Sequence, residues 1–310
     1  MSRFSKIIFV HGGREAYPEI AAYRAFFASR YETAEERPHS SALAFDLSQT
    51  IVWMIMGFYP KKPPAGFVIH DYRSLSIGRL WRIKDWVKRM ANAKPDVRIF
   101  QNEAMAKAMG FGDGVPTFFL PMGVPPFVAS CRAKAKESYD CDFCYIGVMS
   151  AERRTQEMID SFLKRFGSAK IFHLYGEPEP FLGELYKENT NIVFKGRQSQ
   201  QAVFAALTRA RAAVNYFPNH HPHRLQTPTK LLEYAALGLR IACNEQPQSR
   251  LTSQQYGIHC WWGVAQDMFA LMPDELTWPD NQLFDPAPLL WPSVIERSGI
   301  AALLETEGEK

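Results

Sequence analysis

The sequence predicts an α/β protein made of two doubly wound, Rossmann-like domains, and three observations lead to this fold class. Strand-like apolar segments alternate with helical segments along the chain, as in parallel sheets covered by helices. The chain has 310 residues, more than one ordinary core holds. A Pro- and Gly-rich break at 120–126 separates two such alternations. We therefore expect one domain at 1–126 and a second at 127–290.

Each predicted domain follows the same order of strand and helix. The first is expected to contain strands near 6–10, 67–70, 97–101 and 117–120, and helices at 17–29, 75–92 and 103–109. The second is expected to contain strands at 143–147, 170–175, 191–195, 212–217 and 240–243, and helices at 152–166, 199–210 and 227–238.

The composition is that of a soluble globular protein, with 46% hydrophobic and 22% charged residues. The first apolar run, 5–11, is too short for a signal peptide, and the run at 50–58 is far shorter than a membrane-spanning helix. The five cysteines are an odd number, which favours reduced thiols. These features predict a cytoplasmic protein without a transmembrane segment.

Two short motifs invite a metal interpretation, but we expect no metal at either. Cys141-x-x-Cys144 lies in an alternating, strand-like segment without a second cysteine pair, so we interpret it as structural. The segment 220–223, His-His-Pro-His, lies in a polar loop without a neighbouring carboxylate or cysteine. The pair Asp140-x-Asp142 also falls in the strand segment rather than on a loop.

The most informative segment is 227–238, which reads as a helix with clear start and stop signals. Thr227 is a good N-cap, Pro228 suits the first helical position, and Gly238 suits the left-handed position after the last turn. The free N–H groups and the positive end of the helix dipole at 227–230 form an anion site. Lys230 adds a cation there.

Glu233 lies one turn further along the same helix face as Lys230. Six residues from the cap span ~9 Å of helix, close to the distance from a diphosphate to its ribose. A carboxylate at that point can accept hydrogen bonds from both ribose hydroxyls. The segment therefore fits a nucleoside diphosphate.

The same segment resembles the donor-binding helix of GT-B glycosyltransferases in the clade around family 4. The matching residues are Pro228, Lys230, Glu233, Tyr234, Ala236 and Gly238, followed by a strand. Further segments resemble this family in the same order: 7–13, 118–124, 143–154, 191–196 and 291–304.

The resemblance implies the GT-B fold, in which two Rossmann-like domains face a central cleft and the C-terminal segment, here 291–310, returns to the N-terminal domain. It implies a metal-independent transferase that needs no cofactor. The donor would be a nucleotide-diphosphate sugar of the UDP or GDP type, and the acceptor a glycan or lipid-linked molecule. Polysaccharide biosynthesis is the associated process.

The resemblance also assigns candidate site residues. Those expected to bind the donor are Gly12, Gly13, Arg153, Arg154, Gly196, Arg197, Thr227, Thr229, Lys230 and Glu233. Either Arg153 or Arg154 would clamp the diphosphate, where a cation neutralises charge on the leaving group.

Titratable groups at predicted strand ends are the candidates for catalysis. His70 and Asp71 end one apolar strand, and His11 ends another, with Glu15 just beyond it. We expect them to manage protons or sugar hydroxyls.

One position departs from the family pattern. Many retaining members carry a glutamate eight residues before the ribose-binding one, and here that position is Leu225. His223 or Arg224 could supply the sugar contact instead. Retention is the favoured stereochemical course, but this departure leaves it open.

The segment 75–90 mixes helical apolar spacing with cations and two tryptophans. This pattern suits a helix on an anionic membrane surface, although Leu80, Ile83, Val87 and Met90 could equally face the core. Peripheral contact with the inner membrane surface is therefore one hypothesis. We expect no nucleic-acid binding, because a single basic helix without stacking platforms is insufficient.

Two alternative functions remain open on this fold. A nucleotide-sugar epimerase would use the same donor site without an acceptor. A pseudo-glycosyltransferase would bind a partner or glycan without catalysis, as Leu225 and the short first domain would allow.

Overall fold

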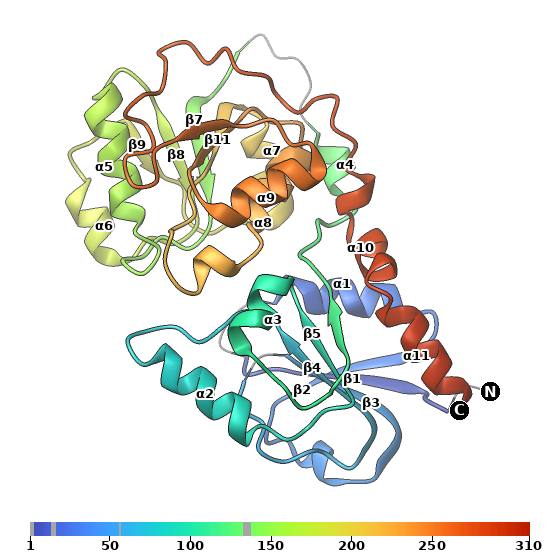
Figure 1. The fold of residues 1–310 in the computed structure, drawn as a ribbon. Coiled ribbons are helices and arrows are strands. Elements are labelled where there is room, and N and C mark those ends of the chain that lie inside the picture. The colour runs from blue at the N-terminus through green and yellow to red at the C-terminus, as the bar shows by residue number, and fades with distance from the viewer. Residues whose placement is uncertain (1–2, 14–16, 56, 133–137) are drawn as a thin grey trace. The chain divides into compact units, whose positions relative to one another are not determined.

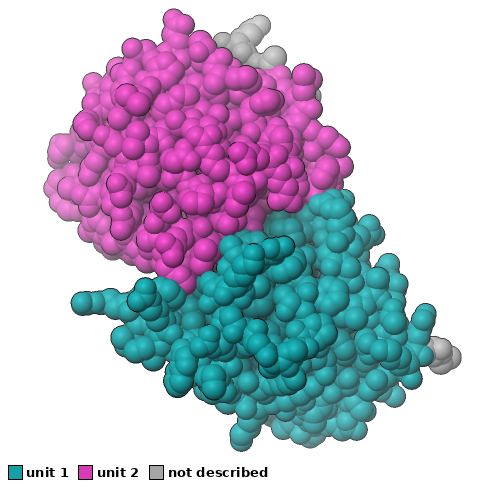
Figure 2. Space-filling view, in the orientation of Figure 1, with its two compact units in different colours: residues 1–123, 290–310 teal, residues 124–289 magenta. Residues whose placement is uncertain are grey.

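The computed structural model describes residues 3–13, 17–55, 57–132 and 138–310, which form two compact units (Figures 1 and 2). Unit 1 comprises residues 1–123 and 290–310, and unit 2 comprises residues 124–289. The first division, after Gly123, falls inside the Pro- and Gly-rich break. Each unit is built on a six-stranded, fully parallel sheet with helices between the strands.

The sheet of unit 1 has the order β2-β1-β3-β4-β5-β6 (Figure 1). Its strands are β1 (Lys6–Val10), β2 (Glu32–Glu36), β3 (Leu47–Ile55), β4 (Ala65–Tyr72), β5 (Val97–Phe100) and β6 (Thr117–Phe119). Sequence reasoning missed β2 and β3. β2 is an edge strand with three glutamates, so it lacks the apolar alternation that marks a half-buried strand.

The helices of unit 1 are α1 (Pro18–Phe27), the 3₁₀ turn η1 (Ser41–Ala44), α2 (Trp81–Ala91), α3 (Glu103–Met109), α10 (Trp291–Arg297) and α11 (Ile300–Glu309). Two predicted helices need correction. The helix expected at 75–92 begins only at Trp81, after Gly78 with φ of 82°. The single helix expected at 291–304 is divided into α10 and α11 at Gly299, whose φ of 77° interrupts a right-handed helix.

An aromatic cluster fills one face of this sheet. Trp53 on β3 lies between Phe9 on β1 and Tyr23 on α1, at ring-centroid distances of 5.6 and 4.8 Å. Trp291 on α10 packs edge-on against Tyr23 at 5.9 Å. Trp291 also covers Gly123, where an added Cβ would lie 2.6 Å from the indole ring. The C-terminal segment is thus an integral part of unit 1.

The sheet of unit 2 has the order β12-β11-β10-β7-β8-β9 (Figure 1). Its strands are β7 (Cys141–Ile146), β8 (Phe172–Tyr175), β9 (Ile192–Phe194), β10 (Ala210–Asn215), β11 (Ile241–Asn244) and β12 (Trp261–Gly263). Its helices are α4 (Val128–Cys131), α5 (Thr155–Phe166), α6 (Pro180–Leu185), α7 (Gln200–Leu207), α8 (Thr229–Ala236) and α9 (Pro247–Tyr256), with 3₁₀ turns η2 (His223–Leu225) and η3 (Ala287–Leu289).

Buried aromatic residues form the core between β7 and α5. Phe143 lies 5.8 Å from Phe162 and 5.3 Å from Phe269, both in edge-on geometry. The two cysteines of the Cys-x-x-Cys motif lie on opposite faces of β7, because they are three residues apart on a strand. Burial raises the pKa of both thiols, that of Cys141 to about 12. The structural interpretation of this motif is confirmed.

The predicted stop of the 227–238 segment is confirmed, whereas the predicted start is wrong. Gly238 has φ of 77°, and the N–H groups of Gly238 and Leu239 donate to the carbonyls of Ala235 and Tyr234. This is a Schellman arrangement. The helix begins at Thr229, and Pro228, with ψ of 89°, precedes it without a side-chain cap. Thr227 is not the N-cap, because Pro228 lacks helical backbone angles and itself occupies the position before the first helical residue.

No helix in the described part of the chain is both long and apolar enough to cross a membrane.

Candidate functional site

Three glycines lie together where β7, β8 and β9 end. Gly147, Gly176 and Gly196 all have positive φ, at 138°, 131° and 65°. The Gly176 N–H donates to the Gly196 carbonyl at 2.9 Å, and a Cβ on Gly176 would lie 2.2 Å from the Gly147 carbonyl oxygen. A side chain is therefore excluded at Gly176, and the positive φ of all three residues favours glycine at this edge, where the carboxyl ends of parallel strands commonly bind ligands.

The first turn of α8 faces this glycine edge. An added Cβ on Gly147 would lie 2.8 Å from Lys230 Nζ, so only glycine leaves room for that ammonium group. Ile146 donates its N–H to the Tyr234 hydroxyl at 3.1 Å, which ties α8 to the end of β7. Thr229, the first helical residue, belongs to the turn whose N–H groups lack partners within the helix. Thr227, just before the helix, is buried.

Lys230 is a half-buried cation without a counter-ion. Within the described ranges, its ammonium group makes neither a hydrogen bond nor an ion pair, and lies 5.3 Å from the centroid of the Tyr145 ring. Burial lowers the pKa of Lys230 to about 7; Arg153 lowers this pKa further and Glu233 opposes the shift. Among the described residues, neither Lys230 nor Arg153 forms an ion pair with a carboxylate, and two such cations favour the binding of an anion.

The structure distinguishes the two arginines that follow β7. Arg153 is half-buried, and its guanidinium lies 3.1 Å from His223 Nδ1 and 5.8 Å from the centre of the Phe217 ring. Arg154 is partly exposed and pairs with Glu157 at 3.3 Å. Among the described residues, Arg154 is the only non-glycine residue with a positive φ, at 50°. Of the two arginines, Arg153 is the one whose charge lowers the pKa of Lys230.

Glu233 is buried one turn behind Lys230. Its carboxylate accepts a hydrogen bond from Gln200 Nε2, at the start of α7, at 3.0 Å. Burial raises the pKa of Glu233 to about 7, although Lys230 and Gln200 oppose the shift. Because its side chain is buried, Glu233 is not a solvent-exposed surface residue. A buried carboxylate with one protein donor retains acceptor capacity for further hydroxyl groups.

The remaining donor-site candidates of unit 2 lie at its loops. Gly196 belongs to the glycine edge, whereas Arg197 is exposed. Leu225 ends the 3₁₀ turn η2, and Arg224 beside it is exposed. His223 is buried and already bound by protein side chains, so it is not free to replace the absent glutamate.

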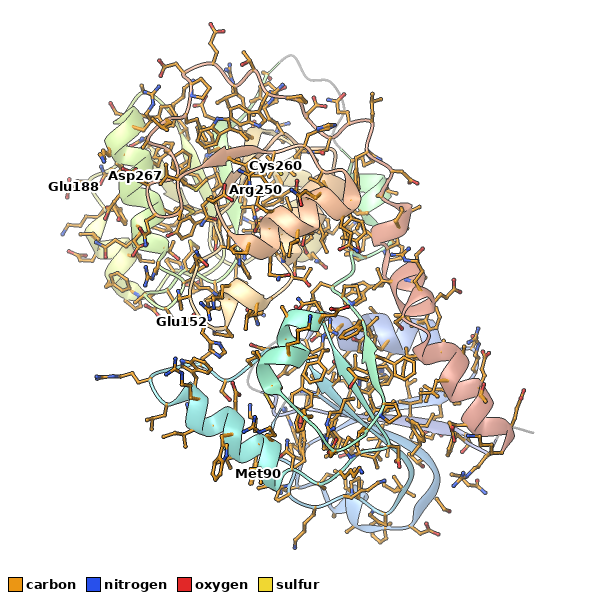
Figure 3. The ribbon with its side chains drawn as sticks, in the orientation of Figure 1. Met90, Glu152, Glu188, Arg250, Cys260 and Asp267 are labelled. Carbon is orange, nitrogen blue, oxygen red and sulfur yellow. The ribbon has the colours of Figure 1, made fainter. Side chains whose placement is uncertain are left out.

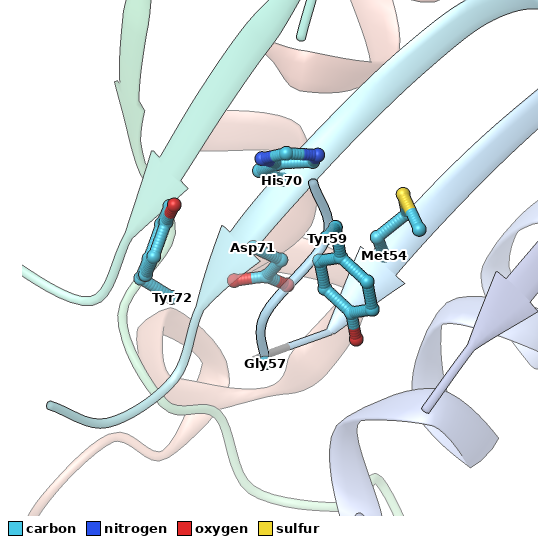
Figure 4. A pocket seen from close by; sticks show the side chains of 6 residues that line it. All are labelled: Met54, Gly57, Tyr59, His70, Asp71 and Tyr72. Atoms are coloured by element: carbon cyan, nitrogen blue, oxygen red, sulfur yellow. The ribbon is translucent and has the colours of Figure 1, made fainter. Parts of the chain in front are cut away.

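In unit 1, His70 lies near the end of β4 and lines a small pocket together with Met54, Gly57, Tyr59, Asp71 and Tyr72 (Figure 4). Burial lowers the pKa of His70 to about 4, and the charges of Arg98 and Lys62 lower it further. Its Nδ1 has no hydrogen-bond partner in the part of the chain that the structure describes. His70 is thus a neutral, buried imidazole with one unused nitrogen.

Asp71 does not form an acid–base pair with His70, because consecutive strand residues point to opposite faces. Its carboxylate accepts hydrogen bonds from Trp53 Nε1 at 3.0 Å and Tyr23 Oη at 3.2 Å. Arg73 lies 3.5 Å away and also contacts Glu19 at 3.7 Å. The hypothesis of paired strand-end groups is therefore wrong in its geometry, and Asp71 belongs to a buried charge network.

In the loop after the first strand of unit 1, protein side chains already contact two of the candidate site residues. His11 Nε2 lies 3.2 Å from Glu35 Oε2. Gly13 has φ of 64°, and the guanidinium of Arg37 occupies the space where its Cβ would lie. Gly12 has open space around its Cα. Glu15 lies outside the described residues.

The histidine loop at 220–223 differs from the prediction in one respect. A carboxylate does accompany it, because Glu152, 71 residues before His223, lies 2.8 Å from His223 Nε2 (Figure 3 labels Glu152). His220 Nε2 lies 3.5 Å from the same carboxylate. Sequence reasoning also missed Gly176 and Gln200. Gly176 could have been found, since it follows a predicted strand as Gly147 and Gly196 do.

No family model and no curated protein matches this chain in sequence. Solved structures do match its fold. AviGT4, a glycosyltransferase of avilamycin A biosynthesis, has 14% identity, 98% coverage of both chains and a TM-score of 0.61. Anabaena HepE in complex with UDP and glucose has 9% identity, coverage of 98% of this chain and 97% of HepE, and a TM-score of 0.60.

A Listeria monocytogenes protein provisionally assigned as a UDP-N-acetylglucosamine 2-epimerase also matches, with 10% identity and a TM-score of 0.55 over 99% of this chain and 98% of that protein. The matched glycosyltransferases have the GT-B architecture of two parallel sheets with interleaved helices. The predicted resemblance is thus confirmed at the level of the fold: this chain has the GT-B fold.

Proposed function

We propose that the chain is a metal-independent glycosyltransferase whose donor, a nucleotide-diphosphate sugar, binds unit 2. The observation that carries this proposal is the two cations Lys230 and Arg153, which form no ion pair among the described residues, with Lys230 at the glycine edge. A buried ammonium group is unfavourable without a counter-ion, and a diphosphate supplies one. The same cations would neutralise the charge that develops on the departing nucleoside diphosphate.

Glu233 extends the site toward the nucleoside. It lies one helical turn from Lys230, and its carboxylate can accept the ribose hydroxyls in addition to Gln200. The Gly196 loop would approach the base. HepE, which shares the fold, has been solved with UDP and with UDP-glucose, which supports a nucleotide-sugar donor of this class.

Unit 1 would hold the acceptor, with His70 as the strand-end group that contacts a sugar hydroxyl. His70 is neutral at pH 7 and has a nitrogen free for such a bond within the described structure. The epimerase reaction remains a second candidate, since the Listeria protein that is provisionally assigned as an epimerase shares the fold. An assay that detects free nucleoside diphosphate without transfer to any acceptor would favour the epimerase.

We further propose that α2 rests on an anionic membrane surface. Ile83, Trp86 and Met90 form one exposed stripe, at 57%, 55% and 65% exposure, and Figure 3 labels Met90 on this helix. The buried position on α2 is instead Asp85, which accepts the Ser76 N–H at 3.0 Å. This arrangement inverts the usual amphipathic pattern.

Exposed cations surround the stripe of α2, namely Arg82, Lys84 and Arg89. An apolar stripe with basic neighbours is complementary to anionic lipid headgroups. A lipid-linked acceptor would be met at such a surface.

Calorimetric titration with UDP, GDP, ADP and CMP, with and without EDTA, tests the donor proposal. We expect one nucleoside diphosphate to bind with one-to-one stoichiometry in the presence of EDTA as well as in its absence. Glu233→Ala should weaken the binding of that nucleotide more than the binding of inorganic pyrophosphate, because pyrophosphate has no ribose. Full nucleotide affinity in Glu233→Ala would contradict the ribose assignment, and no binding of any nucleotide would contradict the donor site.

A further inference from the structure

Three side chains of unit 2 converge at a point that the donor site does not use. The carboxylate of Glu152 and the imidazoles of His220 and His223 offer ligand atoms that all lie within 4.8 Å of one another. Both oxygens of Glu152 lie within 2.9 Å of His223 Nε2, and His220 Nε2 lies 3.5 Å from one of them. The two imidazoles meet edge to face at 5.1 Å.

This set has the chemistry of a transition-metal site. Zinc binds histidine nitrogens and carboxylate oxygens at about 2.0–2.2 Å in tetrahedral geometry, which separates neighbouring ligand atoms by roughly 3.5 Å. The three ligand atoms can reach that separation with small side-chain movements. Two imidazoles and one carboxylate suit zinc or cobalt, whereas magnesium and calcium prefer oxygen ligands.

A supporting partner for the buried histidine is already in place. Gln226 Oε1 lies 3.0 Å from His223 Nδ1. Histidines that bind a metal through one nitrogen commonly donate the other N–H to such an oxygen, which fixes the tautomer. We propose that Glu152, His220 and His223 form a zinc-class metal site, and that the metal releases Arg153 from His223.

The release follows from the two neighbours of His223 Nδ1. Arg153 Nη1, 3.1 Å away, can only donate, so its bond requires a lone pair on Nδ1 and the proton on Nε2, facing Glu152. A metal on Nε2 takes the place of that proton. The proton then resides on Nδ1, donates to Gln226 and can no longer accept from Arg153.

The guanidinium of Arg153 is then available to an anion. This second half of the proposal rests on the proposed donor function, in which Arg153 binds the diphosphate beside Lys230. Bound metal would tighten diphosphate binding, both by freeing Arg153 and by adding positive charge. Bound diphosphate would tighten metal binding by the same factor. The metal takes no part in glycosyl transfer here, and acts on donor binding alone.

Titration of the metal-free protein with Co²⁺, followed by its visible absorption, tests the site itself. We expect one equivalent to bind and Zn²⁺, but not Mg²⁺, to displace it. His220→Ala and Glu152→Gln should each lower the affinity for Co²⁺ at least tenfold. The matched control is His259→Ala, which removes an exposed histidine of the same unit and should leave the affinity unchanged. The metal site would be overturned if the wild-type protein bound no stoichiometric Co²⁺, or if both site variants kept the wild-type affinity for Co²⁺.

Titration of UDP or GDP into protein preloaded with one equivalent of Zn²⁺ tests the release of Arg153. We expect the wild-type dissociation constant to fall about threefold to tenfold, and Arg153→Ala to abolish most of this effect. Equal nucleotide affinity with and without Zn²⁺ would contradict the release. If Co²⁺ binds as expected while no nucleotide binds in either state, the metal site stands and both the release and the proposed donor function are overturned.

Discussion

The two units have the same class of sheet topology, but they differ in whether the charged groups at their strand ends are paired. In unit 1, Asp71 receives two neutral donors and an arginine, and that arginine also contacts Glu19. In unit 2, neither Lys230 nor Arg153 forms an ion pair with a carboxylate of the described residues, although Arg153 acts on the pKa of Lys230. A network of paired charges stabilises a fold, whereas cations without an ion-pair partner favour the binding of an anionic ligand.

The strand-end glycines, in contrast, are similar in the two units. In unit 1, the space beside Gly13 is filled by the guanidinium of Arg37. In unit 2, Gly147 makes room for Lys230, and Gly196 has open space at its Cα. Strand-end polar residues alone therefore do not identify a binding site. Open backbone does not separate the units, because Gly12 of unit 1 has open space as well. What distinguishes unit 2 is a pair of cations without an ion-pair partner among the described residues.

The largest expected effect comes from breaking the network of paired charges. Asp71→Ala removes the nearer of the two carboxylates of the buried Arg73, which keeps the Leu120 carbonyl and the more distant Glu19. We expect a loss of about 3–5 kcal/mol in the free energy of unfolding of unit 1. Denaturant unfolding followed by tryptophan fluorescence measures it. Asp46→Ala, an exposed carboxylate of the same unit, is the control. A cost below about 1 kcal/mol would show that the network is not structural.

The second effect comes from removing the uncompensated charge. Lys230→Ala should lower nucleoside diphosphate affinity by about tenfold to a hundredfold, the loss of about 1.5–3 kcal/mol of a charged hydrogen bond. Stability should change little, because no ion pair of Lys230 is lost. Lys187→Ala removes the same charge from an exposed position of unit 2 and should not weaken binding. Equal losses in both variants would indicate only a general electrostatic effect.

The pH dependence of binding sharpens this distinction. The pKa of Lys230 is lowered to about 7 by burial, so its ammonium form is lost as pH rises above 7. A bound diphosphate favours the charged form, and affinity should therefore fall between pH 7 and 9, by at most about tenfold per pH unit for one proton. Lys230→Arg stays charged and should flatten the profile. A wild-type affinity that is constant over this range would contradict the assignment.

The smallest effect concerns α2 of unit 1. Trp86→Ala removes a half-exposed ring and should weaken binding to vesicles of anionic lipid by about 1 kcal/mol, or about fivefold. Co-sedimentation measures it, with Leu283→Ala as a control that removes a fully exposed apolar side chain of unit 2. Wild-type protein that fails to bind anionic vesicles would contradict membrane contact.

Sequence reasoning reached the features that local chemistry determines. The alternation of strands and helices, the stop of α8 at Gly238 and the shared helix face of Lys230 and Glu233 all follow from residue types and spacing. Polar edge strands such as β2 escaped it, because they lack an apolar period. The inverted face of α2 could not be predicted, since its pattern fits either orientation.

Contacts over long sequence distances account for the remaining differences. Glu152 reaches His223 from 71 residues away, and Trp53 binds Asp71 from a neighbouring strand. The choice of Arg153 over Arg154 depends on a left-handed backbone at Arg154, which no local signal predicts for arginine. These features arise from tertiary packing and required the structure.

Hydrogen-exchange mass spectrometry, with and without the nucleoside diphosphate that binds most tightly, tests the central claim most directly. Our account places the nucleotide on unit 2, so slowed exchange should appear in peptides that cover 147–153 and 229–233, while the loop at 11–13 of unit 1 remains unchanged. Slowed exchange confined to the strand ends of unit 1 would contradict it, since the network of paired charges rather than the unpaired cations would then bind the nucleotide.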